Sequence, residues 1–122
     1  MNKKGRIINI TSPGSTKVMN NYFSIGVSKA ALESMTRYMA FDLASKDINV
    51  NSISASLLET DAIKHFPNQD EINDILKRSN PKQKKLIPND IAKVAIMLCS
   101  EGGDMIVGQN ILVDGGDTLL LR

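Results

Sequence analysis

Apolar and polar residues follow two different periods along the 122-residue chain, and the two periods alternate from segment to segment. Residues 5–11 form a short β-rich run followed by the loop formers of 12–15, so we expect a buried strand that ends in a loop. Residues 48–54 alternate apolar and polar positions, and 109–113 form a third β-rich run before a pair of glycines. The sequence therefore predicts three strands.

Three other segments carry apolar residues three and four positions apart, as one face of a helix requires. The longest covers 22–44, with Asn20 or Asn21 available as its N-cap. Helices are also predicted over about 69–79 and about 89–100, each followed by helix-breaking proline or glycine residues. Strands that alternate with long helices are typical of an α/β fold whose parallel strands are joined by right-handed crossovers.

The small number of strands limits the fold that the chain completes. A doubly wound nucleotide-binding sheet has about six strands, and its first strand opens into a glycine-rich turn that cradles a pyrophosphate. The glycine pairs here, 102–103 and 115–116, follow a helix and the last strand instead. We therefore expect residues 1–122 to form a single partial domain. It would be the C-terminal half of a Rossmann-like doubly wound parallel sheet, with about three strands and three to four helices, without the N-terminal βαβ half that binds phosphate.

Composition and charge exclude several kinds of partner. Fifteen Lys and Arg residues against thirteen Asp and Glu leave a net charge of +2, too small for a nucleic-acid groove or a membrane surface. No apolar segment approaches the roughly 20 residues of a membrane span, so we expect a cytoplasmic protein. Cys99 is the only cysteine and ends the apolar run 94–99, which favours a buried core thiol, and we expect no metal site.

Tyr22 and Lys29 are the first candidates for chemistry. Seven helical residues turn through about 700°, so both side chains are expected on one face of the predicted helix, about 10 Å apart along its axis. A ligand would fit between them, and Gly26 would let it approach the helix closely. A nearby ammonium or helix N-terminus favours ionisation of a phenol, which suits a proton donor. Helices also carry such pairs on solvated faces, so the spacing alone leaves both interpretations open.

Other polar residues have a structural and a functional interpretation. Ser12 closes the first predicted strand and would place a hydroxyl beside a substrate carbonyl, although serine in a loop is often a turn former. His65 is a candidate general acid, but a structural role is the simpler interpretation of this residue. A run of cationic residues is either a solvated face or a contact for an acidic carrier protein: Lys82, Lys84 and Lys85.

Four runs of the sequence resemble the short-chain dehydrogenase/reductase superfamily in order and spacing: 8–12, 22–29, 50–54 and 108–116. Most of that family has its tyrosine four residues before the lysine, where this chain has Ile25. The seven-residue spacing resembles the enoyl-acyl-carrier-protein reductase branch, and 21–38 and 59–67 are particularly similar to its NADPH-dependent bacterial type. The resemblance covers nearly all 122 residues and corresponds to the C-terminal half of a family member.

The resemblance implies NADPH-dependent reduction of a trans-2-enoyl thioester in fatty acid synthesis, with NADH as the alternative cofactor. Tyr22 would hydrogen-bond the thioester carbonyl and stabilise the enolate, and Ser12 would orient the substrate. Lys29 would hold the nicotinamide ribose, while the backbone around Leu58 and the side chain of Thr60 would contact the nicotinamide carboxamide and phosphate. Acyl carrier protein is the implied partner, and a homo-oligomer the implied assembly.

The same resemblance places a substrate loop at about 55–80. Residues 57–68 and the following helix would cover the acyl chain, with four apolar side chains as candidate lining: Ile63, Phe66, Ile72 and Leu76. The family's usual Pro-Gly pair in this loop is replaced by Ala55-Ser56, which removes no reactive group.

The sequence leaves three functions open. The first is an enoyl-acyl-carrier-protein reductase-like enzyme that is inactive as these 122 residues alone, because the cofactor cradle is absent from them. The second is a non-catalytic remnant that acts as an interaction module through the long helix, with residues 6–11 as an apolar sheet edge that invites association. The third is a short-chain reductase that acts on ketones or alcohols.

Overall fold

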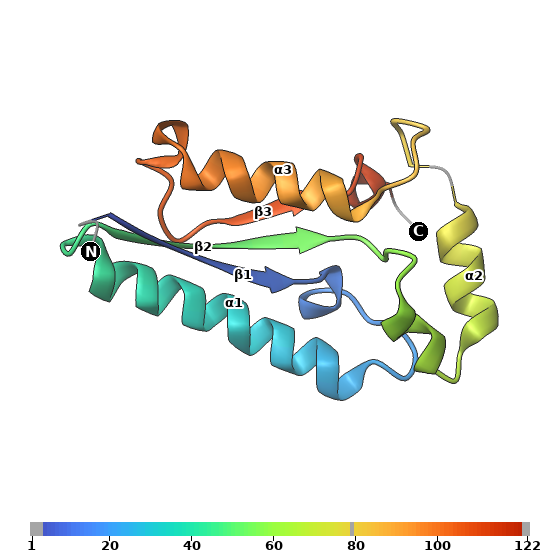
Figure 1. The fold of residues 1–122 in the computed structure, drawn as a ribbon. Coiled ribbons are helices and arrows are strands. Elements are labelled where there is room, and N and C mark those ends of the chain that lie inside the picture. The colour runs from blue at the N-terminus through green and yellow to red at the C-terminus, as the bar shows by residue number, and fades with distance from the viewer. Residues whose placement is uncertain (1–3, 79, 121–122) are drawn as a thin grey trace.

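A three-stranded parallel sheet forms the centre of the protein in a computed structural model, which describes residues 4–78 and 80–120 (Figure 1). The strands lie in the order β1-β2-β3, and Thr11 of β1 is paired in register with Ser54 of β2. Their bounds are β1 Gly5–Thr11, β2 Ile48–Ala55 and β3 Asn110–Val113. The predicted α/β fold with parallel strands is confirmed.

Helices cover both faces of the sheet. The helix α1 (Phe23–Ala44) packs on one face and α3 (Pro88–Cys99) on the other, while α2 (Gln69–Lys77) stands beyond the carboxyl ends of β1 and β2 (Figure 1). Short 3-10 helices occupy the connections at Pro13–Ser15, Asp61–His65, Glu101–Gly103 and Asp117–Leu119. No helix within the described residues is long and apolar enough to cross a membrane.

The core is centred on β2, whose residues from Asn49 to Ala55 are all buried. Val50 and Ile53 are fully buried, and the adjacent helices contribute Ala40 and Leu98. The polar positions of β2 are also inside, because Asn51 donates to the Ile106 carbonyl at 2.8 Å and accepts from the Gln109 backbone N–H at 2.9 Å. The alternating pattern thus marks a central strand with satisfied polar groups rather than a solvated face.

Two local expectations are wrong. Tyr22, rather than Asn20 or Asn21, is the N-cap of α1, and Asn21 adopts a left-handed backbone conformation with φ of 58°. Cys99 is exposed, because adjacent helical residues point about 100° apart and its neighbour Leu98 takes the position that faces the core.

The turn after β3 is organised by a buried carboxylate. Asp114 accepts hydrogen bonds from the backbone N–H groups of Gly116 and Thr118 and from the Thr118 hydroxyl, at 2.7–2.9 Å. Burial alone would raise the pKa of Asp114, but the hydrogen bonds from Thr118 and Gly116 outweigh it and hold this pKa below its ordinary value. The ionised carboxylate therefore stabilises the folded turn.

We expect the Asp114 turn to make the free energy of unfolding depend on pH in the acidic range. Because the folded pKa of Asp114 is lowered, its contribution is present above its unfolded pKa of about 3.9 and is lost as the pH falls through the folded value. Asp114→Ala should lower the free energy of unfolding at pH 7 by about 2 kcal/mol, measured by urea denaturation. The difference between the two proteins should shrink below about pH 4, and a difference that stays constant to pH 2 would contradict this assignment.

Candidate active site

The carboxyl ends of β1 and β2 open onto a cavity of about 1010 Å³. Ligands of open α/β sheets bind at this edge of the sheet. The cavity is lined by the five residues for which the resemblance implies catalytic or cofactor-binding roles, and these come from three separate segments: Ser12, Tyr22, Lys29, Leu58 and Thr60. The structure therefore brings the predicted site residues together, while their chemical roles remain predictions.

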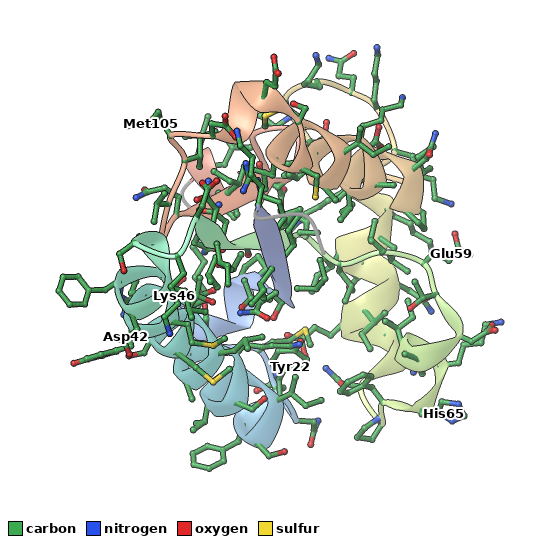
Figure 2. All side chains as sticks on the ribbon, turned by 60° about the vertical axis from the view of Figure 1, so that its left-hand side comes forward. Tyr22, Asp42, Lys46, Glu59, His65 and Met105 are labelled. Carbon is green, nitrogen blue, oxygen red and sulfur yellow. The ribbon has the colours of Figure 1, made fainter. Side chains whose placement is uncertain are left out.

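Ser12 and Tyr22 form the polar centre of the cavity wall. Ser12 directly follows the last residue of β1, and Tyr22 is the N-cap of α1. The Ser12 Oγ lies 3.0 Å from the Tyr22 hydroxyl oxygen, so the two hydroxyls share a hydrogen bond. Figure 2 shows Tyr22 on the side of α1 that faces α2 and the segment bearing His65. Each hydroxyl has one O–H donor, so both can donate to one ligand carbonyl oxygen, which has two lone pairs, when the ligand replaces their mutual hydrogen bond.

A close backbone approach fixes this pair. The residues 12–15, which we call the serine turn, pack directly against the first turn of α1. A Cβ atom on Gly26 would lie 2.8 Å from the Gly14 carbonyl oxygen, and one on Gly14 would overlap the Tyr22 ring. Gly26 is buried by the serine turn itself. The expectation that its missing side chain makes room for a ligand is therefore wrong, because the chain's own turn occupies that space.

Lys29 lies one helical turn beyond Gly26 and is oriented by the end of β1. Its Nζ donates to the Ile10 carbonyl oxygen at 3.0 Å. An ammonium group has three N–H donors, so two remain for a ligand in the cavity. The arrangement suits a residue that holds a polyhydroxyl group such as ribose.

Residues 57–68 of the substrate loop lie across the cavity from α1. Phe66 contacts the Tyr22 ring with centroids 5.8 Å apart, and the Asn68 amide donates to the Asn20 carbonyl at 3.0 Å. Among the predicted apolar lining, Ile63 does line the cavity. The other three do not: Ile72 is buried in the core, Leu76 lines a separate cavity of about 440 Å³, and Phe66 contacts Tyr22 outside the lining. Ile75 of α2 also lines the cavity, although the sequence did not single it out.

His65 and the cationic run lie away from the two hydroxyls. His65 and Glu59 are exposed, and Figure 2 shows both pointing outward. Lys85 of the cationic run is paired with Glu59 at 2.5 Å, and this hydrogen bond and charge lower the pKa of the Glu59 carboxyl. Within residues 4–78 and 80–120, no cluster of His, Cys, Asp and Glu side chains could hold a metal ion.

One polar residue of the site was not predicted. The Glu33 carboxylate of α1 accepts hydrogen bonds from the hydroxyls of Thr11 and Ser15. Thr11 directly precedes the serine turn, and Ser15 is its last residue. Its sequence signal is its position four residues after Lys29, which places it one helical turn further on the same face. A glutamate on a helix face is common, and the signal has no meaning until the partner loop is known.

Comparison with known proteins finds extensive similarity. The profile of the family described as enoyl-(acyl carrier protein) reductase matches residues 1–118. The NADH enoyl-[acyl-carrier-protein] reductase of Bacillus subtilis is 34% identical over 122 residues, which are 100% of this chain and 47% of that protein. The 7alpha-hydroxysteroid dehydrogenase of Escherichia coli K12 is 37% identical over 115 residues, 94% of this chain and 45% of that protein.

Solved structures show the same similarity. The Bacillus cereus enoyl-acyl carrier protein reductase in complex with NADP+ and an indole naphthyridinone superposes with a TM-score of 0.89 at 32% identity, covering 100% of this chain and 48% of that one. The chain thus spans about half the length of the curated relatives that it matches.

Gly26→Ala should separate the serine turn from α1, because the new Cβ would meet the Gly14 carbonyl at 2.8 Å. We expect a loss of about 1–3 kcal/mol in the free energy of unfolding, with NMR shift changes concentrated at residues 12–15. Gly102→Ala is the matched control, since its Cβ would meet only the Ser100 Oγ at 3.6 Å. Equal effects of the two substitutions would contradict the proposed packing.

Proposed function

We propose that the site serves NADPH-dependent reduction of trans-2-enoyl thioesters, because the chain belongs to the enoyl-(acyl carrier protein) reductase family of short-chain dehydrogenases/reductases. The observation that carries this proposal is the 3.0 Å contact between the Ser12 and Tyr22 hydroxyls at the wall of a large cavity. In this reaction a hydride reaches the β-carbon, and negative charge develops on the thioester oxygen.

Tyr22 and Ser12 would act on that oxygen. Hydroxyl donors that are already in place where charge develops lower the barrier without reorganisation during the reaction. Tyr22 lies at the N-terminus of α1, whose dipole favours negative charge nearby. Tyr22 would therefore bind the enolate oxygen, and Ser12 would orient the substrate carbonyl once the hydrogen bond between the two hydroxyls is exchanged for bonds to the substrate.

The nicotinamide cofactor, which would supply the hydride when bound, would be held by Lys29, Leu58 and Thr60, which line the same cavity. Lys29 has two N–H donors free for ribose hydroxyls beyond its bond to the Ile10 carbonyl. Leu58 and Thr60 line the cavity opposite, where the backbone and the Thr60 hydroxyl would contact the carboxamide and phosphate. These roles follow from the family resemblance and from the shared cavity.

NADPH is the proposed cofactor, with NADH as the alternative. The Bacillus subtilis relative carries NADH in its name, while the Bacillus cereus structure contains NADP+. The residues that distinguish the two act on the adenosine ribose in the first βα unit of such folds, which has no counterpart in the described residues. For the same reason we propose that these 122 residues are inactive alone.

The proposed substrate carrier is acyl carrier protein, as the names of the enoyl reductase relatives suggest, and the proposed compartment is the cytoplasm. Residues 57–68 would cover the acyl chain, with Ile63 and Ile75 among the apolar lining. Nucleic acid and membrane are not proposed partners.

A second candidate is reduction of a ketone or oxidation of an alcohol. The same two hydroxyls could donate to a ketone oxygen. The 37% identity to a hydroxysteroid dehydrogenase also favours this reaction. The spacing of seven between Tyr22 and Lys29 favours the enoyl reaction.

Homo-oligomer formation is supported by the outer face of α1. Four large side chains there lie within about 60° of one another around the helix axis and are exposed to between 57% and 86%: Phe23, Val27, Tyr38 and Phe41. Apolar stripes of this length mark interaction surfaces. The same face would serve the interaction module that is the non-catalytic alternative.

The reaction can be tested by joining the N-terminal half of the Bacillus subtilis relative to this chain. We expect the fusion to oxidise NADPH or NADH with a crotonyl thioester faster than with an acetoacetyl thioester, and the 122-residue chain alone to give no turnover. Tyr22→Phe should lower kcat of the fusion about 100-fold to 1,000-fold, as loss of an oxyanion donor does. Tyr38→Phe, on the same helix but 74% exposed, is the control and should leave kcat unchanged.

Three results would count against this proposal. Wild-type kcat in the Tyr22→Phe fusion would remove Tyr22 from the mechanism, preference for the keto substrate would favour the second candidate, and turnover by the chain alone would refute its proposed inactivity.

The oligomer can be tested by sedimentation of the purified chain. We expect a dimer or larger assembly that Phe41→Glu converts to the monomer, because a charge would have to be buried. Met105→Glu, at an exposed site on another segment, should leave the assembly intact. A wild-type chain that sediments as a monomer at about 100 μM, a concentration at which weak interfaces associate, would refute the oligomer.

A further inference from the structure

We propose that Glu33 is a positioning residue that holds the serine turn against α1 and thereby sets the Ser12 hydroxyl beside Tyr22. The proposal rests on the proposed function for its catalytic consequence. Its structural part stands on contacts that involve neither a cofactor nor a substrate.

The contacts come from both sides of Ser12. The Glu33 Oε1 accepts from the Thr11 hydroxyl at 2.8 Å and from the Ser15 hydroxyl at 2.7 Å. It also accepts from the Asn110 side-chain amide at 3.3 Å, which links the same oxygen to β3. Thr11 precedes Ser12 directly and Ser15 ends the turn. A single carboxylate oxygen is therefore bonded to residues on both sides of Ser12.

The turn's other contacts with α1 include the Ser12–Tyr22 hydrogen bond and the Gly14–Gly26 packing, and neither ties both ends of the turn to the helix. Pro13 and Gly14 offer no side-chain donors, and the 3-10 helix Pro13–Ser15 is only three residues long, too short to be stable by itself. No Lys, Arg or His side chain in the described ranges lies within 4.0 Å of the Glu33 carboxylate. No ion pair therefore competes with the turn and Asn110 for its oxygens. Hydrogen bonds to an ionised acceptor are also about twice as strong as those between neutral groups.

Burial makes the Thr11 contact costly to lose. Thr11 is 3% exposed, so without Glu33 its hydroxyl would lie inside the protein with no acceptor. Ser15 would lose its hydrogen bond to α1, and the turn would be held by its backbone bonds, the Ser12–Tyr22 bond and the Gly14 contacts. Lys29 would be unaffected, because it is held by the Ile10 carbonyl upstream of the turn.

The structural test is amide hydrogen exchange in the full 122-residue chain. Three amides report on the turn: Ser15 donates to the Ser12 carbonyl, and Thr16 and Lys17 donate to the Pro13 carbonyl. Glu33→Ala should speed their exchange by about tenfold or more, the effect of losing one buried hydrogen bond on local opening. Glu33→Gln keeps an acceptor oxygen and should restore most of the protection.

The matched control is Thr36→Ala on the same helix. It removes a hydrogen bond between α1 and Asn9 of β1 away from the turn, so it should lower global stability without selectively exposing the turn amides. Unchanged exchange at residues 15–17 in Glu33→Ala, or an equal change in Thr36→Ala, would overturn the proposal.

The kinetic test uses the fusion with the relative's N-terminal half. Glu33→Ala should lower kcat about tenfold without changing the KM for the nicotinamide cofactor, and should add little to Ser12→Ala, because both act through the same hydroxyl. Glu33→Gln should recover most of kcat. Full additivity with Ser12→Ala would overturn the positioning role. A wild-type fusion that reduces no enoyl thioester would instead refute the proposed function, while hydrogen exchange decides the structural part.

Discussion

The approach of the Gly14 carbonyl to Gly26 is the constraint on which the site depends. Only a glycine at position 26 lets the serine turn lie on the first turn of α1, and only a glycine at 14 leaves room for the Tyr22 ring. With the turn in that place, Ser12 at the end of β1 and Tyr22 at the start of α1 come within 3.0 Å. Two glycines therefore permit the short distance between two hydroxyls that belong to different elements.

Much of the fold was predictable from the sequence because its signals are local. The period of apolar residues gave three strands and three helices to within two or three residues, and strand–helix alternation gave parallel pairing. The strands and helices depend on chain geometry that neighbouring residues fix by themselves. The spacing of Tyr22 and Lys29 left two interpretations open, and the family resemblance selected these residues with Ser12, which the structure places in the lining of one cavity.

What the sequence could not predict depends on contacts between distant segments. Glu33 acquires its role only when the serine turn lies beside α1, and Asn51 is satisfied only by the loop before β3. Cys99 was misplaced because an apolar run does not show which side of a helix faces the core, a choice that Leu98 decides here. The substrate loop was also less predictable than the strands, because its lining depends on how α2 is rotated above the cavity.

In the proposed reaction the Ser12 and Tyr22 hydroxyls together bind one thioester carbonyl. The infrared stretch of that carbonyl reports this binding directly, when a crotonyl thioester with a labelled carbonyl is bound to the fusion without turnover, in the presence of oxidised cofactor. We predict a stretch at lower frequency than in water, with the shift reduced in Ser12→Ala and nearly abolished in Tyr22→Phe, because preorganised donors polarise the bond. A bound carbonyl at its frequency in water, unchanged by either substitution, would show that the two hydroxyls do not bind it.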